Sequence, residues 1–191
     1  ATLHVYLNGK VASADRPIGA YSAGDGWSET TITWNNAPAI TGGPHSSVSS
    51  FTGGKWYTWD VTAAVAGELA GDGVATLVLR EDTESGVDTL KLFVEKDYNA
   101  SLAPYLEVAT DSPKFTATDD ETVIEWAPAS NMHADTYQGG LFVGCASYQM
   151  NARSYLKFDV SSLGPSPSVQ RAALHVYRND ALNSLVELSP A

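Results

Sequence analysis

Apolar and polar residues alternate through most of this chain, and a period of two favours β-strands over helices as the way to bury its apolar surface. The alternation is clear over residues 56–61, 90–95 and 155–160. Successive side chains of a strand point to opposite faces, so each run is typical of a strand with one buried face. Turn sequences such as 71–73 and 165–167 separate the runs. We predict an all-β sandwich of roughly ten to twelve short strands.

One short helix is predicted over residues 62–69. Thr62 is the expected N-cap, and Val65 and Leu69 fall on one face at a spacing of four residues. The sequence Gly-Asp-Gly at 71–73 ends the pattern. A helix of this length is too short to be stable alone, so we expect it to close an open end of the sandwich.

An internal repeat joins the two ends of the chain. Residues 1–8 read ATLHVYLN and residues 172–179 read AALHVYRN, so six of eight positions are identical at an offset of 172 − 1 = 171 residues. Chance similarity between two strands is the alternative, but the matching His and Tyr argue against it. The chain therefore contains one unit of about 171 residues and the beginning of a second.

Two longer motifs resemble a known family. The motif WSETTITWNNAP lies at 27–38 and SYLKFDVSSL at 154–163. Together with their flanks they resemble the DNRLRE-type domain, a family that includes disaggregatase-related repeats of methanogens and alginate-binding carbohydrate modules. Residues 1–110 resemble the closing half of that domain and residues 111–191 the opening half, so the order is swapped. The resemblance implies a jelly-roll β-sandwich.

Two explanations fit the swapped order. The chain is a window on a tandem array, or it is a complete permuted unit with one strand duplicated. In the second case Leu3 and Val5 would claim the same place in a sheet as Leu174 and Val176. The surplus strand would pair with a neighbouring molecule, and a head-to-tail contact of that kind propagates into a filament.

The first predicted function is therefore a non-catalytic extracellular structural module, linked end-to-end with its own copies in a filament, stalk or surface layer. The alternative is a carbohydrate-binding module that serves adhesion or is attached to a polysaccharide-degrading enzyme. Candidate residues for stacking on sugar rings are Trp27, Trp56, Trp126 and Tyr137. Packing beneath loops or at a contact between domains is the other explanation for these rings.

Composition excludes several classes of partner. The chain has 22 acidic and 11 basic residues, a formal charge of −11, which argues against nucleic acid, an anionic membrane surface and an acidic glycan such as alginate. No apolar run is long enough to cross a bilayer. The four histidines show no triad or metal-ligand spacing and GxSxG is absent, so we expect no enzyme and no cofactor. We expect an exported protein of the cell surface, processed or cut from a longer chain.

Three further sites, made up of four residues, are candidates for special chemistry. Asp119 and Asp120 are placed in a loop, where paired carboxylates suit a structural calcium ion, as the resemblance to jelly-roll modules also implies, or are simply solvated. Cys145, the single cysteine, excludes an intrachain disulfide and is either a buried filler or an interchain thiol in a polymer. Asn99 begins the sequon Asn-Ala-Ser and is a glycosylation candidate.

Overall fold

The computed structural model describes residues 7–10, 15–84, 89–108, 114–133, 140–146, 150–164 and 172–177. Its larger sheet has the strand order β1-β6-β10-β11-β5-β2-β3, with β9 also paired to β11. These strands are β1 (Leu7–Lys10), β2 (Ile18–Ala23), β3 (Ile40–Val48), β5 (Val74–Glu81), β6 (Lys91–Val94), β9 (Asp119–Ile124), β10 (Gly140–Ala146) and β11 (Met150–Asp159).

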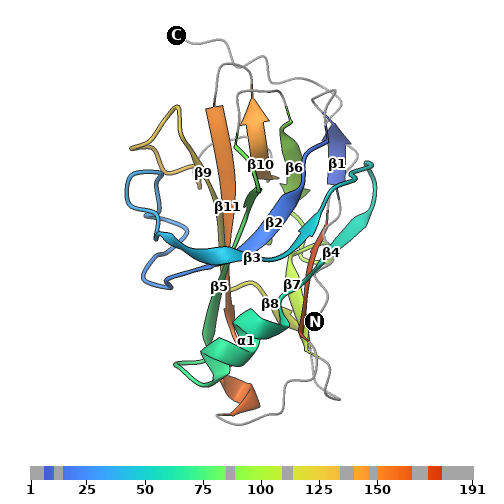
Figure 1. Cartoon of the computed structure of the whole chain (residues 1–191). Coiled ribbons are helices and arrows are strands. Elements are labelled where there is room, and N and C mark those ends of the chain that lie inside the picture. The colour runs from blue at the N-terminus through green and yellow to red at the C-terminus, as the bar shows by residue number, and fades with distance from the viewer. Residues whose placement is uncertain are drawn as a thin grey trace.

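The smaller sheet has the order β4-β12-β7-β8. Its strands are β4 (Trp56–Asp60), β7 (Tyr105–Val108), β8 (Phe115–Thr116) and β12 (Ala172–Tyr177). Every strand pairing is antiparallel. In the larger sheet β10 and β11 lie between β6 and β5, and in the smaller sheet β12 lies between β4 and β7, so both halves of the chain contribute to each sheet and share one sandwich (Figure 1).

The main core lies between the two sheets. Trp59 and Leu174 of the smaller sheet and Leu77 and Phe158 of the larger sheet belong to one buried apolar cluster. Aromatic rings meet there edge to face, with the ring centroids of Trp59 and Phe93 6.4 Å apart. The prediction of an all-β sandwich with one short helix is confirmed.

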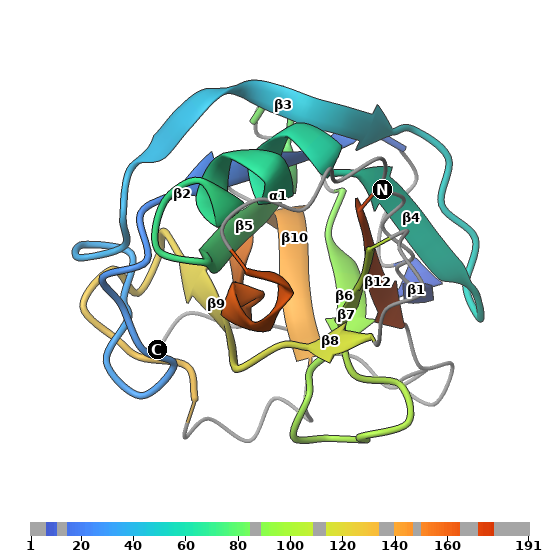
Figure 2. The ribbon, with the colours of Figure 1, turned by 90° about the horizontal axis from the view of Figure 1, so that it is seen from below.

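Helix α1 (Thr62–Leu69) covers one end of the sandwich (Figure 2). Its buried residues Val65 and Leu69 join the main core, as the sequence predicts. The predicted cap is wrong, because Thr62 is the first helical residue and no side chain caps the helix from the preceding position. Oδ1 of Asp60 instead accepts hydrogen bonds from the backbone N (3.0 Å) and Oγ1 (2.7 Å) of Thr62. A short 3₁₀ helix, Ser161–Leu163, follows β11.

Strand β6 departs from the predicted alternation. The pattern places Leu92 on the buried face, yet Phe93 packs in the main core and Lys91 is fully buried on the same side. The Lys91 ammonium donates to the carbonyl of Thr89 and lies 3.8 Å from a carboxylate oxygen of Asp15. Because these partners satisfy the charge, lysine replaces an apolar residue on the inner face of this strand.

The repeated segment is represented by one copy in the smaller sheet. Strand β12 lies between β4 and β7, with Leu174 opposite both Trp59 and Leu106. Val176 stands opposite Tyr57 on the β4 side. Residues 7–10, which begin within the other copy (1–8), form β1, which pairs with β6 in the larger sheet. Leu3 and Val5 lie outside the described residues, so the predicted competition for one place stays a prediction.

A second apolar cluster lies on the outer face of the larger sheet, beneath the segment that connects β2 to β3. Trp27 and Ile32 of this segment pack on Val78, Val123 and Tyr155. The ring of Trp27 meets that of Tyr155 edge to face at 5.8 Å. This cluster anchors the connecting segment, which carries the first residue of the candidate site. No helix in the described ranges is both long and apolar enough to span a bilayer.

Candidate functional site

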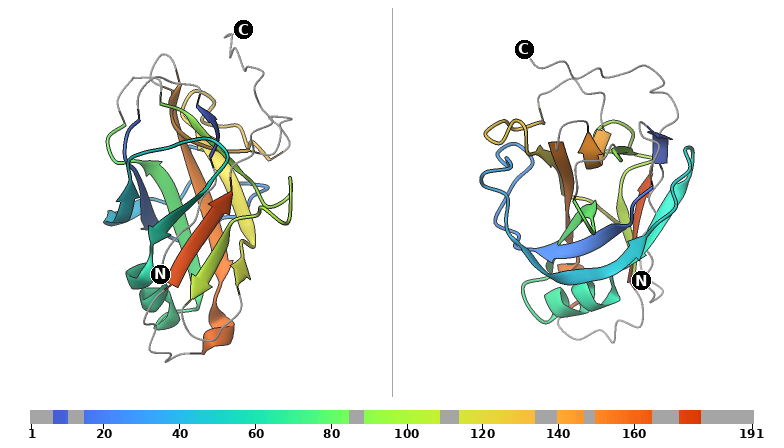
Figure 3. Two further views of the ribbon diagram at one scale, coloured as in Figure 1. Left: turned by 90° about the vertical axis from the view of Figure 1, so that its right-hand side faces the viewer. Right: turned by 45° about the horizontal axis from the view of Figure 1, so that its top comes forward.

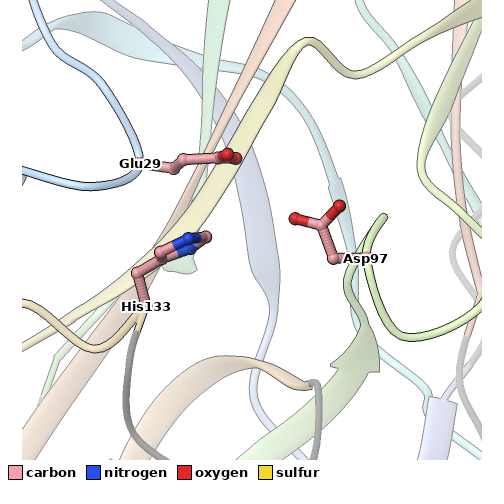
Figure 4. Close-up of side chains that lie close together, drawn as sticks. All are labelled: Glu29, Asp97 and His133. Atoms are coloured by element: carbon pink, nitrogen blue, oxygen red, sulfur yellow. The ribbon is translucent and has the colours of Figure 1, made fainter.

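Three connecting segments meet at one edge of the larger sheet and bring together Glu29, Asp97 and His133 (Figure 4). Glu29 comes from the segment between β2 and β3, Asp97 from the turn after β6, and His133 from the segment after β9. One polar atom from each side chain lies within 4.8 Å of the others. These residues are 68 and 36 positions apart in sequence (97 − 29 and 133 − 97), so no local motif marks them.

Hydrogen bonds between side chains and the backbone hold the segments in register. The side-chain amide Nδ2 of Asn131 donates to the backbone carbonyls of Glu29 and Ile32, both at 2.7 Å. The backbone N of His133 donates to Oδ1 of the same Asn131 at 3.2 Å. The backbone N of Glu29 in turn donates to Oδ1 of Asp119 in β9 at 3.2 Å. Asn131 therefore sets the position of two of the three site residues.

An ammonium group bridges the two carboxylates of the site. Nζ of Lys96 lies 2.6 Å from Oε2 of Glu29 and 2.6 Å from Oδ2 of Asp97. Burial opposes the charge on Lys96, but the hydrogen bonds to Asp97 and Glu29 outweigh it and raise its pKa. The chain thus supplies its own cation between two of the three side chains.

More carboxyl groups lie directly beneath this bridge. Burial raises the pKa of Asp120 well above its usual range, although its Oδ2 accepts a hydrogen bond from the backbone N of Lys96 at 2.7 Å. Burial and repulsion from Glu95 raise the pKa of Glu121 to about 8. Oε2 of Glu121 lies 3.7 Å from Nδ1 of His133. At neutral pH Glu121 is therefore mostly a neutral acid that is able to donate a hydrogen bond.

Two exposed aromatic side chains lie on the segments that supply the site. Tyr98 directly follows Asp97 and is 45% exposed, and Trp126, in the segment that leads to His133, is 47% exposed. They are the large apolar residues that are exposed in the described part of the chain. Sequence reasoning singled out Trp126 and missed Tyr98, for which the only signal is a tyrosine within the polar run Lys-Asp-Tyr-Asn.

The other predicted stacking residues lie elsewhere. Trp27 is 8% exposed, donates from its indole N to Oγ1 of Thr76 at 3.1 Å and offers no free ring face. Trp56 is half-buried on the smaller sheet, with its ring 5.4 Å from that of Tyr105. Tyr137 lies outside the described residues.

The predicted calcium pair is not a pair in space. Asp119 and Asp120 begin strand β9 instead of lying in a loop, so their side chains point to opposite faces. Asp119 Oδ2 lies 3.7 Å from Nζ of Lys157, while Asp120 is buried against the backbone of Lys96. These residues do not fit a shared calcium ion. The Glu29 site does not fit one either, because calcium takes oxygen ligands and this site holds a histidine and a bridging ammonium.

The remaining two candidates have clear surroundings. Cys145 is fully buried in β10, and its backbone N donates to Oγ1 of Thr89 at 3.0 Å. Asn99 is exposed in the turn after β6. Its Oδ1 accepts hydrogen bonds from the backbone N (3.0 Å) and Oγ (2.7 Å) of Ser101, the third residue of its own sequon.

Comparison with known proteins identifies one relationship. The sequence model of carbohydrate-binding module family 96 matches residues 1–110, more than half of the chain. No curated protein and no solved structure gives a significant match.

Proposed function

The chain belongs to carbohydrate-binding module family 96, and we propose that it binds a polysaccharide at the edge formed by Tyr98, Trp126 and the Glu29–Asp97–His133 cluster. A carbohydrate-binding module is non-catalytic in itself, and modules of this kind generally act outside the cell. The observation that carries the proposal is that both exposed aromatic residues lie on segments that also supply polar side chains of the cluster.

This combination suits the chemistry of a sugar. An aromatic ring covers the apolar face of a pyranose, and carboxylates and imidazoles hydrogen-bond its hydroxyl groups. Asp97 and His133 are both exposed, and His133 has Glu121 beneath it at 3.7 Å. Both exposed side chains are therefore accessible to a ligand.

Charge limits the class of glycan. Most basic side chains that the structure describes are already engaged within the molecule. Arg153 holds Glu84 by two hydrogen bonds of 2.7 Å, and Lys91 is fully buried. Three more cations lie over aromatic rings, namely Arg80 over Tyr21, Lys114 over Tyr105 and Lys157 over Trp27. With few cations left for carboxylates or sulfates, the proposed ligand is a neutral or amino-substituted polysaccharide instead of a polyuronate.

Affinity electrophoresis tests the proposal with mannan, chitosan and alginate as soluble probes. We expect retardation by mannan or chitosan and none by alginate. Trp126→Ala and Tyr98→Ala should each weaken binding by roughly tenfold, equivalent to about 1.4 kcal/mol. Trp56→Ala on the smaller sheet is the matched control and should bind normally.

The outcomes separate the parts of the proposal. No retardation by any of the three probes refutes it for these glycan classes, and retardation by alginate alone refutes the charge argument. Loss of binding in Trp56→Ala with normal binding in Trp126→Ala would move the site to the other sheet. A polysaccharide-binding module of this kind is compatible both with a role in adhesion and with attachment to a polysaccharide-degrading enzyme. The end-to-end structural module stays a prediction from the sequence.

A further inference from the structure

The place that β12 fills between β4 and β7 is here called the strand slot, and a second segment of this chain has nearly the same sequence as β12. In the slot, Leu174 is fully buried opposite Trp59 and Leu106, and Ala172 is fully buried opposite Val108. The slot therefore lies within the main core, and the strand that fills it contributes directly to stability.

Residues 1–6 carry nearly the same sequence as the strand that fills the slot. They read ATLHVY against AALHVY for 172–177, so five of six positions match. The residues that would take the buried positions, Ala1 and Leu3, are identical to Ala172 and Leu174.

The one difference between the two segments falls on the open face. Thr2 replaces Ala173, which stands opposite Asp60 and Glu107, and both of these are exposed. Threonine is more favourable than alanine in strands, so residues 1–6 fit the slot at least as well.

The path of the chain favours exchange. Residue 6 directly precedes β1, and both views of Figure 3 place β1 beyond the arrowhead of β12. A strand of residues 1–6 in the slot would thus end on the side toward β1. The other copy is joined through residues 165–171, seven residues that span at most roughly 25 Å when extended. That length sets how far from residue 164 the segment 172–177 would be able to extend toward a neighbouring molecule.

We propose that residues 172–177 leave the strand slot and fill the slot of a second copy of this chain, while residues 1–6 take their place in the donor. The partner is therefore another molecule of the same protein. Each slot is filled before and after exchange, so the two arrangements are close in energy and the linked population rises with local concentration.

The proposal is tested directly with an acceptor variant, which is a chain that cannot fill its own strand slot. The acceptor lacks residues 1–6 and carries Leu174→Asp, which places a carboxylate against Trp59 in its remaining copy. The donor is the unmodified chain. Analytical ultracentrifugation of the mixture at 100 µM each should show a one-to-one complex. A donor with Leu3→Asp is the matched control: its own slot needs 172–177, so complex formation should fall at least tenfold.

The absence of a complex with the unmodified donor overturns the proposal, as does equal binding by both donors. If the acceptor variant does not fold, thermal unfolding of single-chain variants provides a second test of the proposal. Leu3→Ala should leave Tm unchanged by itself but lower it by roughly 10 °C in a Leu174→Ala background, where residues 1–6 fill the slot. No effect of Leu3→Ala in either background also overturns the proposal.

Discussion

The pH dependence of stability should reveal the buried carboxyl group of Glu121. Its pKa rises from 4.5 to about 8 on folding, because burial disfavours the charged form and Glu95 repels it. Between these two values the folded state binds a proton that the unfolded state has released, so the free energy of unfolding falls as pH rises. Each pH unit of this window corresponds to about 1.4 kcal/mol, so the window amounts to roughly 5 kcal/mol.

Glu121→Gln should remove this dependence. Glutamine retains the acceptor for the backbone N of Thr122, which lies 2.7 Å from Oε1, and carries no charge at any pH. Relative to the unmodified chain, the variant should gain on the order of 5 kcal/mol between pH 4 and pH 9. Urea unfolding at intervals of one pH unit measures this difference.

The control for this experiment is Glu125→Gln. Glu125 is exposed in the segment that follows β9, and its Oε2 accepts a hydrogen bond from Asn151 that glutamine can also accept. We expect its curve to run parallel to that of the unmodified chain. A parallel curve for Glu121→Gln as well would refute the argument, because it would mean that Glu121 ionises normally within the fold.

Three shorter predictions test other parts of the structure. Lys96→Met removes the cation between two carboxylates and should lower stability by about 1–3 kcal/mol in urea at pH 7; a change below about 0.5 kcal/mol would contradict the bridge. Gly73→Ala should cost about 2 kcal/mol or more, because φ is +82° and a Cβ would lie 2.7 Å from Cα of Ser161, whereas Gly67→Ala within α1 meets nothing and should be neutral or stabilising. Calcium at 5 mM should leave Tm unchanged in differential scanning calorimetry, and a rise of several degrees would show that a calcium site exists.

The strands could be predicted from the sequence because burial of one face places an apolar residue at every second position. Leu156 and Phe158 alternate with polar neighbours and both lie in the main core. The same reasoning failed for β6, where Lys91 occupies an inner position that the pattern assigns to the outer face. Thr89 is a local partner, but the carboxylate of Asp15 comes from a segment distant in sequence, and a local pattern holds no information about it.

Site residues were harder to foresee than strands. Tryptophan is found both in cores and on ligand-binding surfaces, so the sequence did not distinguish buried Trp27 from exposed Trp126. Asp119 and Asp120 looked like a pair, but their position in a strand separates them. Burial beneath a connecting segment depends on which segments pack together, and that is a property of the whole fold.

The amino-acid sequence alone determined the β class, the repeated segment and the likeness to a family with carbohydrate-binding members, because each rests on local order along the chain. Only the tertiary structure decided that Glu29, Asp97 and His133 meet, that Lys96 bridges two of them, and that residues 172–177 lie between β4 and β7. The physical reason is that these contacts join segments tens of residues apart. Their geometry is set by the packing of two sheets and the segments that cover them.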